Sequence, residues 1–360
     1  MMRRRARVRR IAEGCYGVAT LLGLSLTGCL MGCADHDDPA SVPIDPAIVI
    51  PPGFPAFEAP ADNQPTPERV ALGRQLFYDR RLSRTHEVSC GSCHFQEHAF
   101  ADPARVSRGV DGKTGTRNAP ALVNLAWGKS FFWHGGAASL EIQAVGPIKN
   151  PLEMDLTLAE ASERLEQDRA LLEAFERAYD EGPSESTIPR ALASFVRSLI
   201  SADSPYDRYL AGAGAALSPA AVRGEAIFNG EKGECFHCHA GINFTNNGFR
   251  NDGSADDDPD QGRYEVTLKE SDIGKFKVPT LRNIAVSGPY MHDGSLATLD
   301  DVIDAYVAGG RGHPNTEPTI APLALTDDDK ADLRAFLESL TDDGFLNEPR
   351  FADPNQGTKR

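Results

Sequence analysis

SCGSCHFQEH, residues 89–98, is the stretch that decides how the rest of this 360-residue sequence is interpreted. Cys90 and Cys93 lie three positions apart, and His94 follows directly. This spacing can hold a zinc ion, form a redox-active disulfide, or attach a haem covalently. Other features of the sequence are needed to decide among these three kinds of site.

The motif occurs a second time, as Cys235, Cys238 and His239. A structural zinc site favours two pairs about 15–20 residues apart, whereas Cys235 lies 142 positions beyond Cys93. A thioredoxin-like disulfide needs no adjacent histidine and belongs to a βαβ pattern that this sequence lacks. Covalent haem accounts for every feature, because cysteines at i and i+3 share one side of a helical turn and the next residue offers an imidazole to iron. We therefore predict two c-type haems, with His94 and His239 as iron ligands.

Each motif follows a similar helical pattern. TPERVALGRQLF (Thr66–Phe77) precedes the first motif, and SPAAVRGEAIF (Ser218–Phe228) precedes the second. Both begin with a hydroxyl N-cap and a proline at the first helical position, and both end in an apolar residue followed by phenylalanine. Two copies of one supersecondary unit are indicated.

Further helices are predicted over four segments: Thr157–Gly182 with a Thr157/Glu160 capping box, and residues 187–201, 298–310 and 326–340. Alternating strand patterns are scarce. The fold class is therefore all-α, with two cytochrome-c-like haem domains packed around a domain interface. The Ala/Gly stretch at 211–217 indicates the boundary, which places the domains at 65–212 and 213–345, followed by a tail at 346–360.

The N-terminus has the pattern of an export signal. A basic segment and a short apolar run precede Cys29 in LTGC, which resembles a lipobox; Cys33 in LMGC is a weaker candidate, and a plain cleaved signal peptide is the alternative. Residues 1–33 are thus a predicted signal, and the proline-rich residues 34–64 a predicted tether. We expect a periplasmic or outer-envelope protein that meets the membrane only through a lipid anchor.

Charge and cysteine usage agree with this location. Residues 1–28 carry six arginines and one glutamate, so their removal takes the net charge from −15 to −20. Such an acidic chain argues against nucleic acid as a partner and favours a basic protein partner. Apart from the two motifs, the remaining cysteines (Cys15, Cys29 and Cys33) lie in or beside the signal.

Several longer runs resemble the bacterial dihaem cytochrome c peroxidase and MauG superfamily. They are CGSCHFQEHAFAD, GTRNAPALVN, FFWHGG, LEIQAVGPIKNPLEM, GKFKVPTLRNIAVSGPYMHDGSLATL and LTDDDKADLRAFLESL. The resemblance covers roughly residues 66–342. It implies that the N-terminal haem reacts with peroxide and that the C-terminal haem passes electrons to it.

The resemblance also implies roles for single residues of the peroxide pocket. Glu153 matches the distal glutamate that moves a proton between the two peroxide oxygens. Gln143 and Pro147 match residues that line the same pocket, and Trp133 matches an indole that relays electrons between the haems. From composition alone, Glu153 would be a surface acid at a helix end and Trp133 a core aromatic residue.

A calcium ion between the domains is part of the same family pattern. Asn118 would bind it through its side chain, and Ser287 and Pro289 through their carbonyl oxygens. The alternative is that Asn118 caps a turn. The acidic run Asp252–Asp260 is predicted to be a solvated loop rather than a metal site.

The sixth ligand of the second haem separates the subtypes, because the peroxidases carry methionine there and MauG carries tyrosine. The matching residue here is Tyr306, which lies at i+7 from Leu299 and so shares the apolar helix face. That placement fits a ligand and a core tyrosine equally. Met291 is the rival ligand. We favour Tyr306, since a phenolate stabilises ferric iron.

Two departures from the family pattern affect the first haem. The family commonly has WDGR where this chain has WHGG, so His134 and Gly136 replace Asp and Arg. His134 could alter haem coupling or act as a ligand in one redox state. His98 lies too early to match the histidine that blocks the peroxidatic iron in some peroxidases. We therefore expect an open site.

The sequence thus predicts a peroxidase that reduces hydrogen peroxide, with a cytochrome c or a cupredoxin as electron donor. A MauG-like oxidase that modifies residues of a partner protein is the first alternative. A dihaem electron carrier without enzymatic activity is the second.

Overall fold

The computed structural model describes residues 47–253, 259–310 and 313–355. The predicted signal with Cys29, the first part of the tether (residues 34–46) and part of the acidic loop lie outside these residues. The helices are α1 (Pro67–Phe77), α2 (Leu140–Lys149), α3 (Leu158–Leu165), α4 (Arg169–Tyr179), α5 (Thr187–Ser198), α6 (Pro205–Leu210), α7 (Pro219–Phe228), α8 (Tyr264–Thr267), α9 (Leu299–Val307), α10 (Asp327–Glu338) and α11 (Asp343–Leu346). The short strands β1 (Phe249–Arg250) and β2 (Phe276–Lys277) pair antiparallel. Within the described ranges, no helix is both long and apolar enough to span a membrane.

The mostly helical fold and its repeat are as predicted. Helices α1 and α7 begin at the expected caps, where the side chains of Thr66 and Ser218 accept hydrogen bonds from the backbone N–H groups of Arg69 and Ala221. After each helix, a short 3₁₀ turn carries the Cys-x-x-Cys motif, over Cys90–Ser92 and Cys235–His237. Local sequence therefore determines both copies in the same way.

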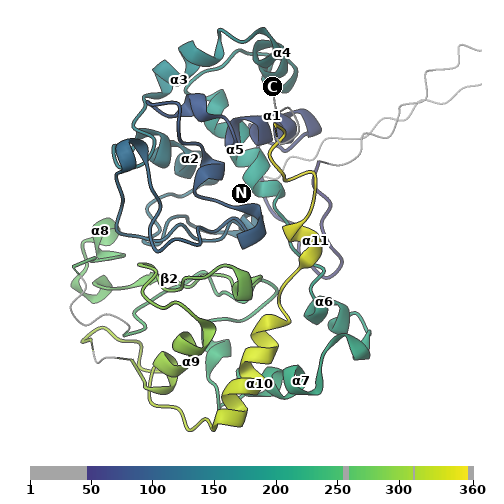
Figure 1. Cartoon of the computed structure of the whole chain (residues 1–360), viewed down its shortest axis with the longest axis vertical. Coiled ribbons are helices and arrows are strands. Elements are labelled where there is room, and N and C mark those ends of the chain that lie inside the picture. Colours follow the sequence, from purple (N-terminus) through teal and green to yellow (C-terminus); the bar gives the residue numbers. More distant parts are fainter. Residues whose placement is uncertain (1–46, 254–258, 311–312, 356–360) are drawn as a thin grey trace, which may run out of the picture. The chain divides into compact units, whose positions relative to one another are not determined.

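Each repeat pairs its first helix with a later one at very close range, α1 with α5 and α7 with α10 (Figure 1). A glycine makes each approach possible. A Cβ atom on Gly73 would collide with the carbonyl group of Ala191 in α5, and one on Gly224 would collide with the carbonyl group of Asp332 in α10. The two repeats thus share a helix crossing as well as a haem motif.

We expect Gly73→Ala to lower the free energy of unfolding by about 1–3 kcal/mol or more, because the added methyl group forces two backbones apart. Chemical denaturation of the haem-loaded protein measures this. Gly182→Ala is the matched control, since nothing lies within 4 Å of a Cβ atom there. Equal stability of the two variants would contradict the proposed close approach.

Two hydrophobic cores correspond to the two repeats. The first is built from α1, α2, α4 and α5 with the loops between them, and includes Leu76, Phe77, Phe100, Phe175 and Phe195. The second is built around α7, α9 and α10 and includes Phe228, Phe244, Ile303, Phe336 and Leu340. Each core lies against its own haem motif, because Cys90 packs on the first and Cys235 on the second.

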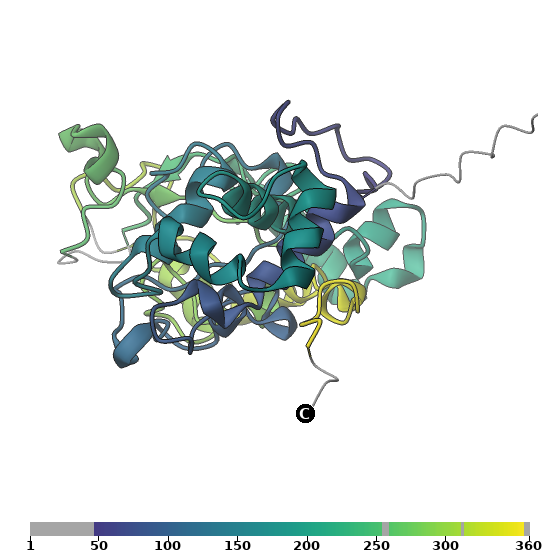
Figure 2. The same ribbon diagram turned by 90° about the horizontal axis from the view of Figure 1, so that it is seen from above.

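The C-terminal segment returns to the first repeat. Tyr78 donates its hydroxyl to the Phe351 carbonyl at 2.8 Å, and Arg74 donates to the Ala352 carbonyl at 2.6 Å. The rings of Phe345 and Phe351 pack against Phe100 in the first core. Figures 1 and 2 show this yellow segment beside the purple α1. The described part of the predicted tail, residues 346–355, therefore covers the first core.

One predicted helix is divided in two. The sequence pattern indicated a single helix over 157–182, whereas the structure has α3 and α4, with the break before Asp168. The Asp168 carboxylate accepts hydrogen bonds from the N–H groups of Ala170 and Leu171, so it caps a new helix instead of continuing the old one. The Thr157/Glu160 capping box at the start of α3 is confirmed.

Candidate active site

A cavity of about 990 Å³ lies between the two repeats. That volume is at the upper end for ligand pockets. Both haem motifs line it, through Cys93 and His94 from the first and Cys235, Cys238 and His239 from the second. Residues separated by more than 140 positions therefore border one continuous space.

Both motif histidines are oriented in the same way. The Nδ1 atom of His94 lies 2.6 Å from the Phe100 carbonyl oxygen, and that of His239 lies 2.9 Å from the Phe244 carbonyl oxygen. A carbonyl only accepts, so each Nδ1 carries the proton and each Nε2 keeps its lone pair. Phe100 and Phe244 have φ angles of 60° and 49°, an unusual conformation that functional loops often retain.

This donor arrangement fits two haems. A histidine that binds iron commonly donates its other N–H to a carbonyl group, which sets the tautomer and the ring orientation. The cysteines Cys90, Cys93, Cys235 and Cys238 form no disulfide within the described residues, so their sulfur atoms are available for thioether bonds. Bound haem iron would supply the redox chemistry of the cavity.

Glu153 is placed near the first haem motif. It lines the cavity, and Asn150 donates a hydrogen bond of 2.6 Å to its carboxylate. Burial raises the pKa of Glu153, and the Asn150 bond opposes that rise. Burial also raises the pKa of Cys93 to about 11, with Asp102 and Glu153 adding to the effect, so the Glu153 charge reaches this motif. A partly buried carboxylate with a raised pKa is suited to proton transfer.

Hydrogen bonds hold the backbone around Glu153 from two sides. Asn150 ends α2 as its C-cap, and its side-chain oxygen accepts from the N–H of Leu152. From the other side, Val110 N–H donates to the Glu153 carbonyl at 2.8 Å. A Cβ atom on Gly109 would collide with Glu153 and Leu152, so only glycine permits this contact.

Helix α2 supplies the other two predicted pocket residues. Gln143 and Pro147 both line the cavity. Pro147 lies inside the helix, where its ring removes one backbone donor. The chain then folds back, because Met154 N–H donates to the Pro147 carbonyl at 3.1 Å. The structure therefore brings Gln143, Pro147 and Glu153 together on one cavity.

Trp133 lies where the two repeats meet. Its indole Nε1 donates to the Asn118 carbonyl at 2.9 Å, and its own carbonyl accepts from Lys277 N–H at 2.8 Å. The side chain lines the cavity. This placement, against backbone of the second repeat, agrees with the electron-relay role that the resemblance implies.

Tyr306 lines the cavity with Leu299, Val302 and Ile303, so all four share one face of α9, as their spacing predicts. Burial raises the pKa of Tyr306 well above its usual value, and the charges of Asp252, Cys235 and Cys238 add to this. Tyr306 therefore lies on the same cavity as the second motif, within range of its electrostatic influence. Met291 also lines the cavity, in a positive-φ conformation at 69°.

The residues predicted to bind calcium belong to the same cavity. Asn118, Ser287 and Pro289 all line it. The Asn118 amide nitrogen donates to the carbonyl oxygens of Asp102 and Ala104, at 3.3 and 3.0 Å, which leaves its side-chain oxygen for a cation. The calcium site stays a prediction.

His134 takes part in an ionic network between the repeats. Its Nδ1 lies 2.8 Å from an Arg117 nitrogen, and arginine only donates, so Nδ1 is the acceptor. Arg117 also forms a bidentate ion pair with Asp260 and a third bond to Glu265. Burial and the Arg117 charge lower the pKa of His134. This atom is therefore occupied, which argues against iron ligation through it.

His98 lies in a different place. Its Nδ1 is 3.0 Å from the Val286 carbonyl oxygen, and it borders a separate smaller hollow with Glu97, Pro103 and Tyr290. It is not among the residues of the main cavity. His98 is therefore not positioned at the main cavity. His134 does line the main cavity, and Arg117 engages only its Nδ1 atom, so iron ligation by His134 in one redox state stays a prediction.

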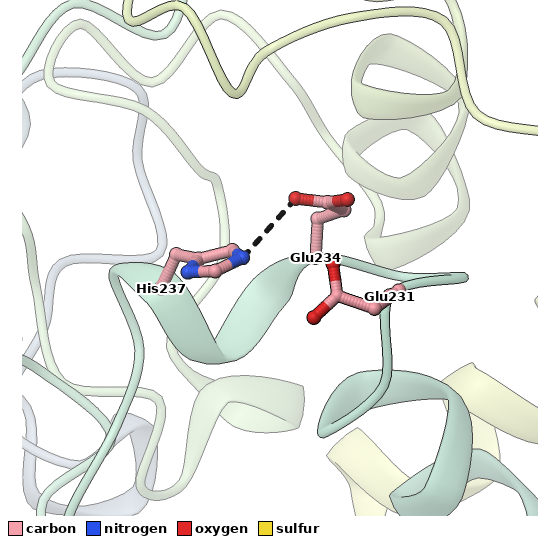
Figure 3. A group of neighbouring side chains, drawn as sticks. All are labelled: Glu231, Glu234 and His237. Atoms are coloured by element: carbon pink, nitrogen blue, oxygen red, sulfur yellow. Dashed lines mark ion pairs between the residues drawn. The ribbon is translucent and has the colours of Figure 1, made fainter.

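Three side chains of the kind that can bind a metal ion lie together near the second motif (Figure 3). Glu231, Glu234 and His237 offer atoms within 4.8 Å of one another. Glu234 and His237 form an ion pair of 3.2 Å, which accounts for their proximity. We assign no site to this exposed group.

Several site residues could not be singled out from the sequence. Asn150 lies inside the quoted NPLEM run, and its position three residues before Glu153 was the available signal. The carbonyl groups of Phe100 and Phe244 carry no side-chain signal. Arg117 and Lys277 lie inside quoted runs, but the two carboxylates that pair with Arg117 and the carbonyl that accepts from Lys277 N–H come from the other repeat.

Comparisons with known proteins agree with the geometry. The family model described as di-haem cytochrome c peroxidase matches residues 67–215, and a cytochrome c model matches residues 221–341. Two such domains imply two covalently bound haem c groups.

Individual relatives belong to both branches of the family. The methylamine utilization protein MauG of Methylorubrum extorquens is 38% identical over 78% of this chain and 80% of that protein. The cytochrome-c peroxidase IdrP1 of Denitromonas iodatirespirans is 34% identical over 83% of this chain and 87% of that protein. The crystal structure of a MauG-like protein associated with microbial copper homeostasis matches with a TM-score of 0.81 and 38% identity, over 85% of this chain and 98% of that one. The chain therefore belongs to the family of dihaem cytochrome c peroxidases and MauG proteins, and it is an oxidoreductase of that type.

Proposed function

We propose that this protein reduces hydrogen peroxide to water at the N-terminal haem, with electrons relayed from the C-terminal haem. The observation that carries the proposal is the partly buried Glu153 carboxylate, which lines the same cavity as Cys93 and is held by Asn150. A dihaem electron carrier has no need for a partly buried acid on this cavity.

The chain's own residues supply the proton chemistry. Glu153 takes a proton from one peroxide oxygen and returns it to the other, which leaves as water. Asn150 fixes the carboxylate for both steps, and Gln143 borders the same space. Two electrons and two further protons complete the conversion of one peroxide to two waters. Trp133 offers a route for the electrons from the second repeat.

Reaction stoichiometry tests this proposal. The fully reduced protein stores two electrons, one on each haem. We expect one equivalent of hydrogen peroxide to disappear, in a peroxide assay that is independent of haem absorption, as both haems become oxidised. Peroxide that persists beside the reduced protein would refute the proposal and favour an electron carrier.

A MauG-like oxidation of a partner protein is the second candidate. The position of Tyr306 favours it, because this residue lines the cavity together with Cys235 and Cys238. A tyrosine ligand would stabilise the oxidised second haem. Long storage of oxidising equivalents after peroxide addition, without any added donor, would support this candidate.

A further inference from the structure

The two repeats meet through a reciprocal pair of backbone hydrogen bonds. Asn118 N–H of the first repeat donates to the His292 carbonyl, and Lys277 N–H of the second donates to the Trp133 carbonyl, each at 2.8 Å. Asn118 and Lys277 each lie two positions before a proline of the cavity, Pro120 or Pro279. Lys277 is thus anchored at the backbone of the predicted electron relay.

The Lys277 side chain lines the cavity, and no carboxylate of the described residues forms an ion pair with it. Burial lowers its pKa to about 8, and this is the only cause of the shift. Among the described residues, no side chain forms a hydrogen bond or ion pair with its ammonium group. An ammonium group inside a protein is costly unless an anion neutralises it.

Unlike Lys277, the two arginines that line the cavity are paired with carboxylates. Arg117 is paired with Asp260 and Glu265, and Arg250 is paired with Glu317 at 3.0 Å. Their charges are therefore already neutralised by protein carboxylates. Lys277 is left as a cation that faces the space into which the cofactors must fit.

A haem carries two propionate carboxylates, and a haem bound at either motif would bring such anions to the residues that line this cavity. We propose that the Lys277 ammonium group binds a haem propionate at the junction of the two repeats, beside Trp133. The pair neutralises a buried charge on each side, and a positive charge at this point favours the reduced state of the haem that it contacts. Lys277 would then help set the driving force for electron transfer between the haems. The inference needs only the bound haems and does not depend on peroxide reduction.

Spectroelectrochemical titration of the two haems in Lys277→Met tests the proposal. Methionine keeps the length of the side chain and removes the charge. We expect the potential of the contacted haem to fall by about 59 mV, which is a tenfold change in the equilibrium constant for one electron. Lys277→Arg should keep the wild-type value.

Lys275→Met is the matched control. This lysine precedes Lys277 by two positions and pairs with Asp272 at 3.3 Å, away from the cavity residues. The proposal is overturned if both potentials in Lys277→Met equal those of the wild type, or if Lys275→Met shifts them as much. Haem content, measured by mass, confirms that each variant is fully loaded. Lys277→Gln gives the same test should the methionine variant fail to accumulate.

Discussion

Glu153→Gln should slow the reaction with hydrogen peroxide by a factor of about 10²–10⁴, the usual contribution of a general acid–base group. Glutamine can occupy the same place and accept the Asn150 hydrogen bond, but it cannot take up a proton and return it. Both haems should remain attached, because neither the cysteines nor the histidines change. Stopped-flow mixing with peroxide measures the rate constant.

Glu163→Gln is the control for this prediction, since Glu163 is an exposed glutamate on α3, a neighbouring helix. The pH profile adds a second readout. Burial raises the pKa of Glu153, so the basic form is lost as pH falls through a value above that of an ordinary carboxyl group. The wild type should show this acidic limb, and Glu153→Gln should not. A variant that reacts as fast as the wild type would remove Glu153 from the mechanism.

Tyr306→Phe should change the absorption spectrum of the C-terminal haem and raise its potential. A phenolate ligand stabilises ferric iron, so its loss favours the reduced state. We expect a rise on the order of 0.1 V, within the roughly 0.8 V that axial ligands can span. Redox titration followed at the bands of the second haem measures it.

The cavity supplies a matched control in Tyr290, whose hydroxyl donates to the Ile284 carbonyl at 2.9 Å. Tyr290→Phe removes a buried hydroxyl group from the same cavity and should leave the potential unchanged. Met291→Leu should also leave it unchanged. If Met291→Leu produces the spectral change and Tyr306→Phe does not, the ligand is methionine and the MauG-like candidate loses its support.

Features with a local cause could be predicted from the sequence. The caps at Thr66 and Ser218 place the starts of α1 and α7, because a hydroxyl group followed by proline acts within one helical turn. The haem motifs are equally local, since the cysteines and the histidine follow one another. The apolar face of α9 followed from its helical spacing, which brings Tyr306 to the cavity.

Features that depend on distant partners could not be predicted. The return of Phe351 and Ala352 to α1 joins residues that are more than 270 positions apart, and nothing in either segment indicates the other. The break at Asp168 was missed because an acidic residue can lie on a solvated helix face as well as cap a new helix. The orientations of His94 and His239 depend on backbone carbonyl groups, which any residue supplies.

We expect the N-terminal haem to be open to peroxide next to Glu153. Absorption and EPR spectra of the oxidised protein, recorded before and after one equivalent of hydrogen peroxide, test it most directly. We predict a high-spin ferric signal from one haem that is lost at once after the addition. Two low-spin haems that stay unchanged, even after one of them has been reduced, would show that neither haem is open to peroxide.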